Sequence, residues 1–141
     1  RKNDMRKITQ RICEAFLQGA KLNLSNTSTD EYIIWLHGNQ IASWAVLDMT
    51  DVPHPYSGVL QISLRGWNTV TTRERLNGLL TYLGSNWRII QRNYRPYAVN
   101  TTVNRHIHLI DVDWYGLQNK AFGNHEWYSR GNRVNEYGGT L

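Results

Sequence analysis

One segment near the middle of the chain constrains the fold most, because it predicts a strand followed directly by a helix. Apolar and polar residues alternate from Val59 to Arg65, as in a strand with one buried face. Thr71 with Glu74 three residues later has the pattern of a capping box, which predicts a helix over residues 72–83. Leucines recur along one side of this helix, and Gly84 is a typical C-terminal stop. The segment therefore predicts a fold that mixes strands and helices.

An earlier helix is expected from Met5 to Lys21, because its apolar residues recur every three or four positions. Asp4 is suited to cap its N-terminus, and the polar run 23–29 predicts a loop after it. The single cysteine, Cys13, lies in this helical pattern and cannot form an internal disulfide. We expect it to be buried as a small apolar side chain.

Further strands are predicted from β-rich runs bounded by turn residues. They cover residues 31–37, 40–47, 86–92, 97–103 and 106–114. The first two flank a Gly38-Asn39 turn and form a hairpin, and the prolines in residues 48–58 predict a connecting loop. Residues 115–141 predict an irregular tail. The expectation is a single α+β domain over residues 1–141, with a small, mainly antiparallel sheet, the N-terminal helix and a second helix after the third strand.

The net charge of +5 is unevenly distributed. Residues 1–22 hold six Lys or Arg against two acids, residues 23–64 hold four acids and no Lys or Arg, and residues 65–95 hold six Arg against one acid. One interpretation is a molecule with a basic face, and the other is pairing between the acidic and basic segments. No apolar run approaches the roughly 20 residues of a membrane span, so no membrane partner is expected.

Two short strings stand out, LHGNQIA at residues 36–42 and GWNTVTTRERLN at residues 66–77. Together they resemble a motif pair, LHGNxIA and GWxTxTTRxRLN, of a family of small, uncharacterised bacteriophage proteins. The resemblance implies a viral origin and a small α+β domain. Together with the single cysteine, which is typical of an intracellular protein, this makes the host cytoplasm the expected location. The family brings no agreed activity, so the resemblance implies no catalytic residue and no cofactor.

The second string also leads a strand into a helix N-terminus, where unpaired backbone N–H groups and the helix dipole favour an anion. The candidate anion- or nucleic-acid-binding residues are Arg65, Trp67, Thr69, Thr71, Thr72, Arg73, Arg75, Arg88 and Arg92. Hydroxyls and guanidiniums would hold a phosphate, and the indole of Trp67 would stack on a base. The alternative is purely structural. Thr71 then only caps the helix, and Trp67 fills the core. Arg75 pairs with Glu74 or Asp48.

His106 and His108 share one face of a predicted strand and are weak candidates for metal ligands. Asp111 and Asp113 lie on the opposite face, so a third ligand on the histidine side is missing from this stretch. A metal-dependent nuclease is the enzyme hypothesis that follows from these residues.

Three functions remain open from the sequence. The preferred one is a nucleic-acid-binding module that uses a basic face of the first helix and residues 65–95, where arginines alternate with aromatic residues. These aromatic residues are Trp67, Tyr82, Trp87, Tyr94 and Tyr97. The second is a protein that binds a host protein or forms part of the virion, and the third is the nuclease. The sequence leaves the oligomeric state open.

Overall fold

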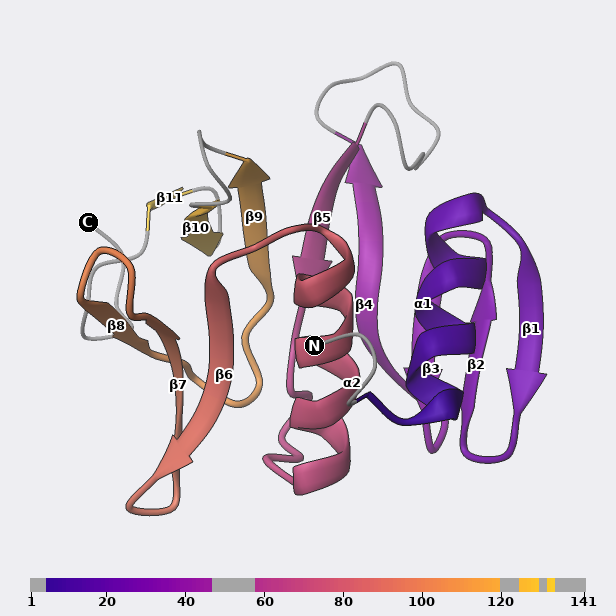
Figure 1. Cartoon of the computed structure of the whole chain (residues 1–141), viewed down its shortest axis with the longest axis horizontal. Coiled ribbons are helices and arrows are strands. Elements are labelled where there is room, and N and C mark those ends of the chain that lie inside the picture. Colours follow the sequence, from indigo (N-terminus) through magenta and orange to yellow (C-terminus); the bar gives the residue numbers. More distant parts are fainter. Residues whose placement is uncertain (1–4, 47–57, 120–124, 130–131, 134–141) are drawn as a thin grey trace.

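The computed structural model describes residues 5–46, 58–119, 125–129 and 132–133 of the 141-residue chain (Figure 1). Within them it has two helices and two antiparallel sheets, which confirms the predicted α+β class. The larger sheet has the order β1-β2-β3-β4-β5-β9-β10-β11, and the smaller has the order β6-β7-β8. The elements are α1 (Lys7–Gln18), β1 (Lys21–Leu24), β2 (Thr27–Asp30), β3 (Ile33–Leu36), β4 (Asn39–Val46), β5 (Gly58–Ile62), α2 (Val70–Tyr82), β6 (Trp87–Arg92), β7 (Arg95–Asn100), β8 (Arg105–His108), β9 (Tyr115–Asn119), β10 (His125–Ser129) and β11 (Asn132–Arg133).

The first helix packs on the first three strands (Figure 1). α1 is shorter than predicted, because Gly19 adopts the left-handed φ of 74° that ends a helix. Its N-cap is Arg6, which makes no side-chain capping bond, and Asp4 lies outside the described residues. Cys13 is buried as predicted, and burial, followed by the charge of Glu74, raises the pKa of its thiol to about 12. The thiol is therefore neutral at physiological pH.

The predicted loop at residues 23–29 is wrong, since these residues belong to the β1–β2 hairpin. Thr27 and Thr29 point inward and are at most 3% exposed. Threonine is β-branched and suits a strand, so this polar run concealed a strand whose buried side is made of threonines.

Two hairpins turn through residues with positive φ. The β3–β4 hairpin turns at His37 (51°) and Gly38 (80°), and Asn39 begins β4, so the turn lies one residue earlier than predicted. The β6–β7 hairpin turns at Asn93 (52°) and Tyr94 (63°). Two positive φ values in a two-residue turn match the twist of the flanking strands.

The predicted strand and helix in the middle of the chain are both present, as β5 and α2. Leu60, Ile62 and Leu64 are buried together, as their alternation predicted. α2 lies between α1 and β6 (Figure 1) and buries its leucines at residues 76, 79 and 80. Neither helix in the described part of the chain is long and apolar enough to cross a membrane.

The C-terminal region contains strands where the sequence predicted an irregular tail. β9 pairs with β5 and β10 pairs with β9, so this region extends the larger sheet. Tyr115 and Trp127 are each 2% exposed and supply part of the core. The predicted β6–β7 pair is confirmed, whereas the strand predicted over 106–114 is limited to β8.

α1 and α2 approach each other closely at Gly78. A Cβ on Gly78 would collide with Cγ2 of Thr9 and would lie 3.1 Å from Sδ of Met5. The absence of a side chain at this position therefore sets the distance between the two helices.

Gly78→Ala is expected to lower the free energy of unfolding by about 1–3 kcal/mol, the usual cost of overpacking. Thr9→Ser removes the colliding methyl group and keeps the hydroxyl, so the double variant should regain part of the loss. Urea unfolding followed by circular dichroism measures both effects. A Gly78→Ala variant as stable as the wild type would show that the close approach imposes no constraint.

Candidate functional site

Residues 65–69, called the α2 entrance below, form a tight turn ahead of the helix and place Trp67 at the surface. Arg65 and Gly66 both have positive φ, 53° and 80°. Trp67 N donates to Leu64 O at 2.8 Å, and Gly66 N donates to Asp111 O at 2.9 Å. Trp67 is 59% exposed, so it does not fill the core.

The helix begins two residues earlier than predicted, so the predicted capping box of Thr71 and Glu74 is wrong. The N-cap is Thr69, whose Oγ1 accepts a hydrogen bond from Thr72 N at 3.1 Å. The carboxylate of Glu74 turns away from the helix start and accepts a hydrogen bond from Thr9. One of the free N–H groups expected to hold an anion is therefore already satisfied within the protein.

Hydrogen bonds from Arg73 connect the α2 entrance to the end of β6. Its Nη1 donates to Asn68 O and to Gln91 Oε1, each at 3.1 Å, and also to Oδ1 of Asn68. Asn68 Nδ2 donates to the same Gln91 oxygen at 3.1 Å. The three polar side chains therefore join the α2 entrance to the β6–β7 hairpin.

Arg75 is 3% exposed, which removes it from the candidate surface. Its Nη1 donates to Thr9 Oγ1 at 2.9 Å, and its Nε donates to Thr27 Oγ1 at 3.0 Å. It also forms an ion pair with Glu74, as the structural alternative predicted. A guanidinium satisfied by these internal partners cannot reach a phosphate. Thr72 is 2% exposed and is likewise withdrawn from the surface.

Asn77 covers the open edge of β6. Its Nδ2 donates to Ile89 O at 2.8 Å, and its Oδ1 accepts from Ile89 N at 2.6 Å. The side-chain amide therefore pairs with the strand as a neighbouring backbone would, on an edge that otherwise exposes unpaired groups.

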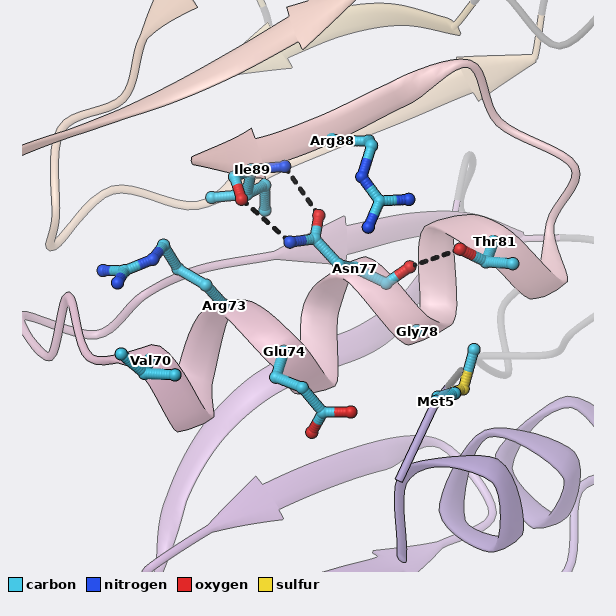
Figure 2. Close-up of a pocket in the computed structure, with 9 residues that line it drawn as sticks. All are labelled: Met5, Val70, Arg73, Glu74, Asn77, Gly78, Thr81, Arg88 and Ile89. Carbon is cyan, nitrogen blue, oxygen red and sulfur yellow. Dashed lines mark hydrogen bonds between the residues drawn. The ribbon is translucent and has the colours of Figure 1, made fainter. Parts of the chain in front are cut away.

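An open groove of about 570 Å³ runs along α2 beside this contact. Figure 2 shows Arg73 from α2 and Arg88 from β6 on the same side of the helix axis, with Glu74 directed toward α1. Arg88 is exposed, and no described residue pairs with its guanidinium. Among the described residues that line the groove, it is the cation without an internal partner, whereas Arg73 is hydrogen-bonded to Asn68 and Gln91.

The tip of the β6–β7 hairpin carries an aromatic ring between two arginines. Tyr94 is 91% exposed and has a φ of 63°. Arg92 and Arg95 lie directly opposite each other in the pairing of β6 with β7, and both are exposed. Arg65, at the neighbouring entrance turn, lies with its guanidinium carbon 5.3 Å from the centre of the Trp114 ring.

The predicted basic face is divided in two. α1 and the β6–β8 sheet lie on opposite sides of α2 (Figure 1), so the basic residues of the first helix do not join those of residues 87–95.

The histidine pair lies on β8 beside Tyr97. The ring of Tyr97 is 5.2 Å from that of His108 and 6.2 Å from that of His106. Within the described ranges, no group of three His, Cys, Asp or Glu could hold a metal ion, so the pair finds no third ligand there.

Comparison with known proteins identifies the family. A family model described as Kyanoviridae Gp96 protein matches residues 5–138. The chain belongs to this phage protein family. No curated protein and no solved structure matches the chain.

The candidate residues of this family member therefore separate into an exposed and an internal group. Arg65, Trp67, Arg88 and Arg92 are exposed, whereas others, such as Arg75, serve the fold. Tyr94 and Arg95 were not among the candidate binding residues, although both belong to the segment 65–95 in which the sequence predicted arginines and aromatic residues to bind nucleic acid. The turn between the two predicted strands singles them out, because hairpin tips project into solvent.

Thr69→Ala is expected to lower the free energy of unfolding by about 1 kcal/mol, the usual value of an N-cap side chain. Thr71→Ala, a matched change two residues later, should alter it by less than about 0.5 kcal/mol. Urea unfolding of the two variants measures the difference. Equal losses would mean that Thr69 is not the cap.

Proposed function

We propose that this protein binds nucleic acid through the α2 entrance and the tip of the β6–β7 hairpin. The observation that carries the proposal is Tyr94, a 91% exposed ring held in a left-handed backbone conformation between Arg92 and Arg95. For a bulky residue this conformation costs on the order of 1 kcal/mol. An exposed ring between two cations is suited to stack on a base while the guanidiniums hold the adjacent phosphates.

The pairing of Arg92 with Arg95 supports the proposal. Like charges directly opposite each other on neighbouring strands destabilise a sheet. No described residue forms an ion pair with either arginine. A bound anion would relieve the repulsion between them.

The surrounding sequence favours a polyanion. Residues 75–110 contain five Arg and two His but no Asp or Glu, and Arg75 is the one among them that forms an ion pair with an acid of the described ranges. Trp67 adds a second exposed ring, held near the hairpin by the Asn68–Gln91 hydrogen bond. Proteins that bind single-stranded nucleic acid combine a positively charged surface with aromatic rings on which bases stack, and this surface has both features.

A host or viral protein is the second candidate partner, and a group of exposed apolar side chains favours it. Trp67, Val70, Ile110 and Val112 are each at least 43% exposed. Val112 lies beside the entrance turn, since its Cγ1 is 3.7 Å from the position of a Cβ on Gly66. Salt dependence separates the two candidates, because apolar contacts do not weaken steeply as salt rises.

The affinity for a labelled oligonucleotide should fall with salt, with a slope of log K against log salt of about −0.7 for each phosphate contacted. Arg92→Gln/Arg95→Gln should make the slope less negative by about 1.4, since two phosphate contacts are lost. Fluorescence anisotropy at several salt concentrations measures both slopes.

The matched control is Lys7→Gln/Arg11→Gln, which removes the same charge from exposed positions on α1. It should leave the slope close to the wild-type value. Equal slopes for the two double variants, or binding independent of salt, would contradict the proposal.

A further inference from the structure

The three-stranded sheet has two faces of opposite character. In an antiparallel sheet, residues directly opposite each other lie on the same face. The inner face contains Trp87, Ile89, Ala98 and Ile107, each at most 2% exposed. The outer face, as defined here, consists of Arg88, Ile90, Arg92, Arg95, Tyr97, Val99, His106 and His108.

The outer face is basic and has no acidic residue. Three of its eight residues are arginines and two are histidines. A solvated sheet face normally mixes charges of both signs. Because all the charge here has one sign, a polyanion is the partner that complements it.

Tyr97 lies at the centre of the outer face. It is opposite Ile90 on β6 and opposite His108 on β8. The rings of Tyr97 and His108 are tilted by 33° to each other with their centres 5.2 Å apart, so the two rings pack against each other as a pair. Arg88 and Arg92 of β6 lie on one side of this pair.

The outer face is continuous with the two features already described. Arg88 belongs to it and also lines the groove along α2 (Figure 2). At the other end of β6, Arg92 and Arg95 connect it to the hairpin tip at Tyr94. A ligand bound at Tyr94 can therefore extend over the outer face, none of whose eight residues is acidic.

We propose that the ligand is a single-stranded nucleic acid, whose bases stack on Tyr97 and His108 while Arg88, Arg92 and Arg95 hold its phosphates. This inference rests on the proposed function and specifies its ligand. A duplex does not fit, because its bases are stacked on one another and cannot lie flat on a sheet. Unpaired bases can stack on exposed aromatic rings of a sheet.

The test compares labelled dT12, rU12 and a 12-base-pair duplex by fluorescence anisotropy, on wild type, Tyr97→Ala and Tyr97→Phe. Either single strand should bind at least tenfold tighter than the duplex, and the stronger of the two identifies DNA or RNA as the source. Tyr97→Ala should weaken single-strand binding about tenfold, whereas Tyr97→Phe keeps the ring and should bind within about twofold of wild type. Tyr32→Ala, which truncates a partly exposed tyrosine outside this sheet, should have no effect.

If Tyr97→Ala fails to fold, photo-crosslinking of the wild-type protein to a 4-thiouridine oligonucleotide tests the same binding surface without a variant. Crosslinked peptides should fall within residues 87–108. Three results would each overturn the single-strand inference: Tyr97→Ala binding as tightly as wild type, crosslinks outside that range, or a preference for the duplex. The proposed function would still stand if Arg92→Gln/Arg95→Gln made the salt slope less negative. No oligonucleotide binding by wild type would overturn both.

Discussion

The buried guanidinium of Arg75 is the interaction on which the arrangement of the other elements depends. It joins three segments, because its partners Thr9, Thr27 and Glu74 belong to α1, β2 and α2. A charge taken out of water is tolerated only when it is paired and hydrogen-bonded, and this one is. Loss of one partner of such a pair typically costs about 3–5 kcal/mol, since the other is left buried without compensation.

Because Arg75 fixes α2 against α1 and β2, α2 in turn positions the surface proposed to bind nucleic acid. One side of the helix is held against α1 at Gly78, where the contact leaves no room for a side chain. The other side holds β6 through the paired amide of Asn77, and Arg73 ties the helix entrance to the end of the same strand. The outer face of the β6–β8 sheet is therefore set in place by α2, and the functional proposal depends on that attachment.

The parts of the fold that could be predicted were those with strong local patterns. β5, α2 and the β6–β7 pair have alternating or three-to-four spacing, which is visible without tertiary information. β2 was missed because its buried side is made of threonines. The C-terminal strands were missed because they are stabilised by pairing with β5, a contact distant in sequence.

The candidate site was predicted only in part, for similar reasons. The burial of Arg75 could have been predicted from the helical spacing. Residues 72, 75, 76, 79 and 80 share one side of a helix, and the leucines among them identify this as the buried side. A charged residue on that stripe requires a partner in the core. The outer face was not predictable, because it depends on the register that aligns Tyr97 with His108.

Binding of single-stranded nucleic acid to the β6–β8 sheet can be followed through backbone amide chemical shifts during titration with a single-stranded oligonucleotide. Perturbed amides should cluster in β6, the hairpin tip, β7 and β8 and include that of Trp67, while those of α1 and β1–β3 stay unchanged. Perturbations that cluster on α1 and β1–β3, or none at saturating ligand, would contradict binding at this sheet.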